Sequence, residues 1–164
     1  NALFDSFTCL QNLLTPLEET LGVVGEPARE KALGLLNAVG LSHAVDLYPD
    51  EISGGMQKRL GIARALAIDP EVILYDEPTA GLDPVTSKII AELMIDLHKK
   101  TKTTLVMVTN DLQRAYQVAD RIAYIGKKRF QIVGSPKETQ ETNDPEIRGF
   151  IYGMTEVVDF EEEK

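Results

Sequence analysis

The sequence predicts an α/β domain in which a helical first part is followed by strands that alternate with helices. Residues 1–70 carry apolar spacings that are typical of helices. After them come two short apolar runs, "EVILYD" and "TTLVMVT", separated by a helical pattern. Because strands that alternate with helices are typical of βαβ units, we expect a parallel or mixed sheet.

The first part contains recognisable helix boundaries. In "EPAREKALGLLNAVG", Pro27 suits a first helical turn and Gly40 is a stop signal. A second boundary lies in "ISGGMQ", where Ser53 is a good N-cap for the helix "MQKRLGIARALAI". We therefore expect one helix after Pro27 and another after Ser53.

In the second part, the spacing of apolar residues changes to that of strands alternating with helices. "EVILYD" and "TTLVMVT" are predicted as buried strands, and "DPVTSKIIAELMIDLHKK" and "DLQRAYQVAD" as helices. "RIAYIG" and "RFQIVG" predict a hairpin around "KK", and "SPKETQ" and "DPEIRGFIYG" predict helices that open with Ser or Asp before Pro. The helix "DPVTSKIIAELMIDLHKK" should bury one apolar stripe, made of Ile89, Ile90, Leu93, Met94 and Leu97.

Composition narrows the class of protein. The chain has 164 residues, which suits one domain or a large piece of one. Its 26 acidic residues outnumber 17 Lys and Arg, so the net charge of −9 argues against nucleic-acid binding. No apolar run reaches the roughly 18 residues that a membrane span needs. The single cysteine cannot form a disulfide within the chain, which fits a reducing compartment.

Two motifs, one made of small residues and one made of two acids, indicate phosphate chemistry. Ser53, Gly54 and Gly55 open a helix, and free N–H groups and the helix dipole at such a start favour an anion, although an ordinary capped helix explains them too. Asp76 and Glu77 end an apolar strand, where α/β sheets bind ligands. An Asp there can hold Mg²⁺ and the next Glu can deprotonate a water, although "DEP" can also simply begin a turn.

Taken together, the motifs identify a family. "ISGGMQ" resembles the signature of the ATP-binding-cassette (ABC) ATPases, "VILYDE" the Walker B strand and "AGLDP" the D-loop, while "VTND" stands where a switch histidine ends its strand. The resemblance implies a P-loop NTPase-like ABC ATPase fold that is incomplete. It would hold a helical signature subdomain in residues 1–70 and the C-terminal part of the parallel-sheet core in residues 71–153. The acidic tail in residues 154–164 departs from the family wording and is most simply a solvated end.

The same resemblance assigns roles to single residues at the signature. In the family, the signature closes on the γ-phosphate of ATP held by a second ATPase subunit in a head-to-tail dimer. Ser53 would offer its hydroxyl, Gly54 and Gly55 their backbone N–H groups, and Gln57 would lie at the edge of that contact.

The remaining roles fall on the acids. Asp83 would cross the dimer interface to the partner's water. Asp76 would bind Mg²⁺, and Glu77 would be the general base for ATP hydrolysis.

Two departures from the family pattern stand out. No G-x-x-x-x-G-K-[ST] loop occurs in the sequence, so the cradle for ATP phosphates is absent and we expect a C-terminal fragment of a longer ATPase. The second departure is Asn110, which stands in place of the catalytic switch histidine. Asn can donate a hydrogen bond but cannot take up a proton, so we expect slow hydrolysis.

The resemblance also implies partners and a location. The wording of "GMQKRLGIARALAIDP" and "DEPTAGLDPVTS" is similar to the phospholipid-transport, or Mla-type, group. A subunit of this kind would be cytoplasmic, peripheral on the inner face of the membrane, and would bind transmembrane permease subunits through its helical part, especially "FDSFTCLQNLLTPLEE". The apolar residues of that segment could equally form the core of the helical part itself. Two alternatives stay open: a non-catalytic partner subunit that supplies the signature face in trans, and a non-transport ABC ATPase of chromosome maintenance or repair.

Overall fold

The structure of the protein is a computed structural model that describes residues 3–153, the side chains of residues 132 and 133 apart. The acidic segment 154–164, predicted to be a solvated tail, lies outside the described residues. Within the described part, the chain divides into two compact units that meet after Asn110. The predicted division by motif, at residues 70 and 71, stays a prediction.

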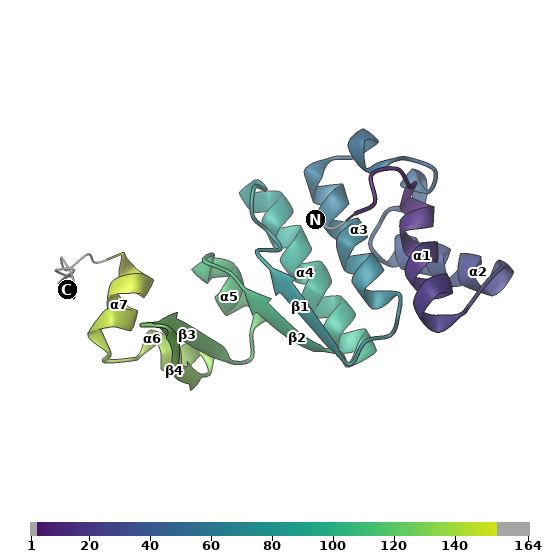
Figure 1. Ribbon diagram of the computed structural model, residues 1–164. Helices are drawn as coiled ribbons and strands as arrows, with labels where there is room; N and C mark the ends of the chain where they lie inside the picture. The colour runs from purple at the N-terminus through teal and green to yellow at the C-terminus, as the bar shows by residue number, and fades with distance from the viewer. Residues whose placement is uncertain (1–2, 154–164) are drawn as a thin grey trace, which may run out of the picture. The chain divides into compact units, whose positions relative to one another are not determined.

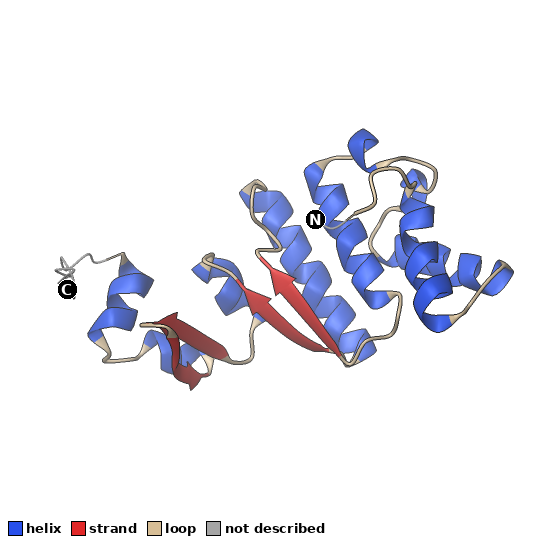
Figure 2. Ribbon diagram, viewed as in Figure 1, coloured by secondary structure: helices blue, strands red, loops and turns tan. Residues whose placement is uncertain are grey.

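The first unit begins with helices and continues into a parallel pair of strands (Figures 1 and 2). Its elements are α1 (Cys9–Leu21), α2 (Glu26–Ala38), the short 3-10 helices η1 (Ser42–Ala44) and η2 (Pro49–Glu51), α3 (Gly54–Leu66), β1 (Val72–Asp76), α4 (Pro84–Thr101) and β2 (Thr104–Val108). The helices predicted after Pro27 and Ser53 are confirmed as α2 and α3. Strands β1 and β2 are parallel, and Asp76 is in register with Val108.

The core of this unit lies between its helices and one face of the sheet. Helix α3 packs against α1, α2 and α4. Leu13, Leu17, Leu36 and Leu60 are fully buried there. Cys9, Leu10, Leu13 and Leu17, the buried apolar residues of the segment expected to contact permease subunits, lie in the core of the unit itself, whereas Phe4 at its start is 45% exposed.

The two strands are less buried than the sequence predicts. Ile73 is buried and Tyr75 packs against the core, whereas Leu74 is 76% exposed on the opposite face. Within residues 3–110, helices cover only one face of this two-stranded sheet, so alternate apolar side chains stay in solvent. The prediction of fully buried strands is therefore wrong for this chain.

Helix α4 supplies the layer that covers the inner face of the strands. Ile90, Met94 and Leu97 are buried as predicted, and Leu93 is half-buried. Ile89, predicted on the same stripe, is 49% exposed. The stripe is narrower than expected because, within residues 3–110, α4 covers one face of the sheet and packs against α3.

The second unit contains a hairpin and three short helices. These are α5 (Leu112–Val118), β3 (Ile122–Gly126), β4 (Arg129–Gly134), α6 (Pro136–Gln140) and α7 (Pro145–Tyr152). The antiparallel pairing of β3 with β4 confirms the predicted hairpin. Lys127 and Lys128 at its turn have positive φ values of 48° and 59°, which a two-residue type I′ turn requires. Ser135 and Asp144 cap α6 and α7, as the Ser-Pro and Asp-Pro pairs predict.

Candidate functional site

The start of α3 is built as the sequence predicts. Ser53 has extended backbone angles, and its hydroxyl accepts a hydrogen bond from the Met56 N–H at 3.3 Å. Ser53 and Gly54 are exposed, so the first turn of the helix is open to solvent. A capped, accessible helix start presents its free N–H groups and the positive end of the helix dipole outward.

Gly55 has a packing role that the sequence does not reveal. It is buried, and a Cβ at this position would lie 2.6 Å from Thr86 Cγ2 in the first turn of α4. Only a glycine lets α3 and α4 approach so closely here. The structure thus gives Gly55 a reason for being small that is independent of any phosphate.

Gln57 is directed toward its own chain. Its side-chain Nε2 donates a hydrogen bond to the Pro49 carbonyl at 2.7 Å. This contact ties the second turn of α3 to η2, the segment that leads into the signature.

The acid pair lies at the carboxyl end of β1. Side chains alternate along the strand, so Tyr75 faces the core, where burial raises its pKa to about 12, while Asp76 is exposed. Glu77 follows the strand with a φ of +44°, a left-handed value that is unusual for a residue other than glycine. Its N–H donates to the Val108 carbonyl at 2.9 Å, which fixes the turn to the end of β2.

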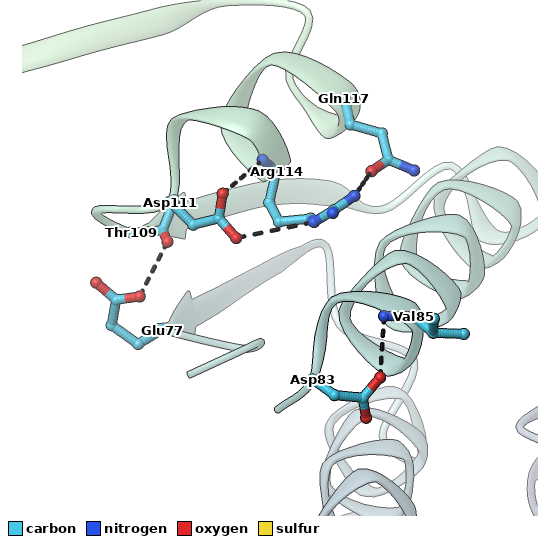
Figure 3. Close-up of polar contacts among 7 residues, drawn as sticks. All are labelled: Glu77, Asp83, Val85, Thr109, Asp111, Arg114 and Gln117. Carbon is cyan, nitrogen blue, oxygen red and sulfur yellow. Dashed lines mark hydrogen bonds and ion pairs between the residues drawn. The ribbon is translucent and has the colours of Figure 1, made fainter. Parts of the chain in front are cut away.

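The carboxylate of Glu77 is held by the residues that follow β2. Thr109 Oγ1 donates to Glu77 Oε2 at 2.9 Å (Figure 3). The Asn110 N–H donates to Glu77 Oε1 at 2.8 Å. Asn110 makes this contact through its backbone N–H, and the residue is exposed. The sequence pattern alone does not single out Thr109. Its place between an apolar strand and Asn110 is the signal that indicates a position at the site.

Asp83 is the N-cap of α4. Its carboxylate accepts a hydrogen bond from the Val85 N–H at 2.9 Å (Figure 3). It also accepts from the Thr86 N–H at 3.0 Å and from the Thr86 hydroxyl at 2.5 Å. The hydroxyl bond and the backbone bonds lower the pKa of Asp83 below its ordinary value. Both oxygens of this carboxylate are thereby engaged within the chain.

A separate polar cluster opens the second unit. Asp111 caps α5 by accepting from the Arg114 N–H at 3.1 Å, and Arg114 Nε lies 3.7 Å from Asp111 Oδ2 (Figure 3). Arg114 is only 6% exposed and also donates to the side chain of Gln117. The buried guanidinium is thus paired locally, which suits a structural role.

The site residues fall into two groups. The structure brings Asp76, Glu77 and Asn110 together at the carboxyl edge of β1 and β2. Ser53, Gly54 and Gly55 open α3, and Gly55 lies against the first turn of α4, which Asp83 caps. Gln57 points to η2 instead of the helix start.

A divalent cation would find few protein ligands in the part of the chain that the structure describes. Among residues 3–153, no three His, Cys, Asp or Glu side chains gather closely enough to hold a metal ion. Asp76 offers an exposed carboxylate at the sheet edge. One carboxylate fits Mg²⁺, because this ion usually keeps several waters and also binds substrate phosphates.

Among residues 3–153, none of the helices has the length and apolar character that a membrane span requires.

Comparison with known proteins defines the class. The family model described as "ABC transporter" matches residues 1–80. A solved ABC transporter of putative metal-chelate type, in an inward-facing conformation, superposes with a TM-score of 0.78 at 24% identity and covers 93% of this chain and 60% of its own. An ATP-binding cassette solved as a dimer in a post-hydrolysis state with ADP and Pi gives a TM-score of 0.71 at 33% identity, over 82% of this chain and 59% of its own.

Curated relatives agree on the family and differ in cargo. The glycine betaine/proline betaine transport ATP-binding protein ProV of Salmonella typhimurium is 38% identical over 93% of this chain and 38% of its own length. The intermembrane phospholipid transport ATP-binding protein MlaF of Escherichia coli is 33% identical over 94% of this chain and 58% of its own. The methionine import ATP-binding protein MetN of Streptomyces avermitilis is 38% identical over 93% and 44%.

Over nearly its whole length the chain is similar to ABC transporter ATP-binding proteins, and its fold is a partial P-loop ABC ATPase fold. It spans 38% to 58% of the length of the curated relatives named above. The Mla-type group is one of several groups to which it is similar.

Proposed function

We propose that this chain belongs to an ATP-hydrolysing subunit that drives an ABC transporter. The observation that carries the proposal is that two hydrogen bonds hold the Glu77 carboxylate. Thr109 Oγ1 donates one at 2.9 Å, and the Asn110 N–H donates the other at 2.8 Å. A general base must hold one orientation to take a proton from an attacking water, and two donors at the sheet edge restrict this carboxylate to one. Glu77 is accordingly our candidate for the base.

ATP and Mg²⁺ are the cofactors that this function requires. Asp76 would hold Mg²⁺, directly or through a water, because its carboxylate is exposed at the same edge. The cation would supply positive charge against the negative charge that develops on the transferred phosphate. Phosphate binding through a G-x-x-x-x-G-K-[ST] loop has to come from polypeptide beyond this sequence.

A second ATPase subunit completes the proposed site. The open first turn of α3, with Ser53, Gly54 and Gly55, is suited to receive a phosphate from the partner's nucleotide. Support comes from the related cassette solved as a dimer with ADP and Pi. Asp83 would reach the partner's water only by giving up part of its capping of α4, and Gln57 would need to turn away from Pro49.

We further propose phospholipid as the cargo, with transmembrane permease subunits as partners on the inner face of the membrane. The motif wording and the relative MlaF favour this choice. ProV and MetN have sequence identities at least as high, and their names give betaine and methionine as the transported substrates. Transport measured with candidate cargo in vesicles would decide among them.

The hydrolytic proposal is tested by Glu77→Gln in the full-length polypeptide that contains this chain. Removing the base while keeping the side-chain shape should abolish hydrolysis and trap an ATP-bound dimer. Gel filtration with ATP measures the dimer, and phosphate release measures hydrolysis. A monomeric profile together with undiminished hydrolysis would contradict the proposal.

A non-catalytic partner subunit is the second candidate, favoured by Asn110 at the position of the switch histidine. Such a subunit would lend its signature to another nucleotide site and hydrolyse nothing itself. Reading the coding sequence upstream of Asn1 separates the two candidates. A Gly-Lys-Ser/Thr loop there favours the ATPase, and an initiator codon next to Asn1 favours the partner subunit.

A further inference from the structure

A lysine of the signature helix reaches the backbone of the catalytic candidate. Lys58, in the second turn of α3, donates a hydrogen bond from Nζ to the carbonyl oxygen of Glu77 at 3.1 Å. Lys58 is half-buried. Within residues 3–153, no carboxylate lies within ion-pair distance of this ammonium, so the carbonyl is its partner in place of an acid.

The backbone that Lys58 contacts is in a conformation that needs support. Glu77 has a φ of +44°, where Cβ crowds the backbone of an ordinary L-residue. Such a conformation persists when the surroundings over-determine it. Three backbone contacts do so: the Glu77 N–H donates to Val108, and the Glu77 carbonyl accepts from Ala80 at 3.2 Å and from Lys58.

The bond from Lys58 differs from the other two in its origin. Val108 ends the neighbouring strand and Ala80 lies in the same turn, but Lys58 comes from α3, the helix that Ser53 opens. A charged donor makes a stronger hydrogen bond than a neutral one, so this contact anchors the turn firmly to α3. Tight packing of Gly55 on Thr86 fixes the same helix against α4.

We propose that Lys58 is a positioning residue, which holds the peptide of Glu77 in its left-handed conformation and so aims the carboxylate from the signature helix. This rests on the proposed function in that Glu77 is taken as the base. One consequence is mechanical: a displacement of α3 by a nucleotide at its N-terminus is carried by Lys58 to the acid of the same subunit. The chemistry at Glu77 then responds to what occupies the signature.

The test compares Lys58→Met and Lys58→Arg with Lys88→Met in the full-length polypeptide. Lys88 is a suitable control because it is an exposed lysine of α4 whose ion pair, among residues 3–153, is with Glu92 at 3.8 Å. We expect Lys58→Met to lower kcat about tenfold with the KM for ATP within about twofold, as expected for lost transition-state positioning. Lys58→Arg, which keeps a cationic donor, should recover much of kcat, and Lys88→Met should match the parent.

A second measurement does not depend on hydrolysis. Amide hydrogen exchange of residues 77–82 reports the stability of the turn itself. Lys58→Met should accelerate exchange there while α1 and α2 keep their protection, which also shows that the variant is folded. Parental exchange in this segment would overturn the positioning role.

The two proposals fail in different ways. If Glu77→Gln is inactive and Lys58→Met keeps the parental kcat, the proposed function stands and the role of Lys58 is wrong. A rise in KM alone would also overturn it, because positioning acts on kcat. If the parent hydrolyses no ATP, the proposed function fails, and exchange in residues 77–82 still decides whether Lys58 holds the turn.

Discussion

Gly55 of the signature lies directly against Thr86 of α4, so that a Cβ at position 55 would stand only 2.6 Å from the Thr86 methyl group. Real Cβ atoms do not approach another carbon so closely. We therefore expect Gly55→Ala to force α3 and α4 apart and to lower the free energy of unfolding by about 1–3 kcal/mol, the usual cost of overpacking. Urea unfolding measures the change.

The chain offers both a control and a rescue for this substitution. Gly61 lies in the same helix with open space around it, so Gly61→Ala should be neutral or stabilise by up to about 1 kcal/mol. Thr86→Ser removes the clashing methyl but keeps the hydroxyl, and combined with Gly55→Ala it should restore most of the lost stability. A double variant no more stable than Gly55→Ala would show that packing on Thr86 does not explain the glycine.

Replacing Thr109 by Val removes one donor to the Glu77 carboxylate while keeping the shape of the side chain. Since the second donor, the Asn110 N–H, remains, we expect hydrolysis by the full-length protein to fall only about 3- to 10-fold, with about 1 kcal/mol or less lost in stability. Steady-state phosphate release measures the rate. Thr109→Ser should stay near the parental value, and so should Thr104→Val on the exposed side of β2. Equal losses in all three variants would count against a specific role for the Thr109 hydroxyl.

Asp83 should make stability depend on pH at the acid end. Its pKa is lowered mainly by the Thr86 hydroxyl and backbone bonds, so its stabilising effect is complete above the unfolded value of about 3.9 and is lost as the pH falls through the lower, folded value. Between pH 4 and 2, roughly, the unfolding free energy of the parent should therefore fall more steeply than that of Asp83→Asn. Denaturant unfolding at several pH values measures both slopes. Asp96→Asn, at an exposed position within α4, should keep the parental slope; if Asp83→Asn keeps it too, the cap does not carry this pH dependence.

Asn110→His is expected to raise ATP turnover in the full-length protein. The backbone N–H of Asn110 holds Glu77, while the side chain is exposed, so the exchange keeps that contact and adds a group that can carry a proton. Single-turnover hydrolysis measures the gain, with Asn143→His in the second unit as the control. An unchanged rate would remove the Asn110 side chain from the account of hydrolysis.

Local features of the fold were predictable because they depend on neighbours in sequence. Ser53 caps α3, Pro27 opens α2 and the Lys127–Lys128 turn joins a hairpin, each through contacts within a few residues. The order of strands and helices was readable for the same reason. Exposure of β1 and β2 was not, since it depends on what covers the second face of a sheet, and a run such as "VILY" has the same pattern either way.

The sequence by itself determined the family, the helix starts and the acids Asp76 and Glu77 at a strand end. Tertiary structure decided which groups hold them: the Thr109 hydroxyl, the Asn110 N–H and the Lys58 ammonium reach Glu77 from 32, 33 and 19 residues away along the chain. No local pattern encodes such contacts, because they form only when folding brings the ends of β1 and β2 and a lysine of α3 to the same turn. It also decided that Gly55 must be small for Thr86, since the spacing between two helices is a property of their packing and not of either sequence alone.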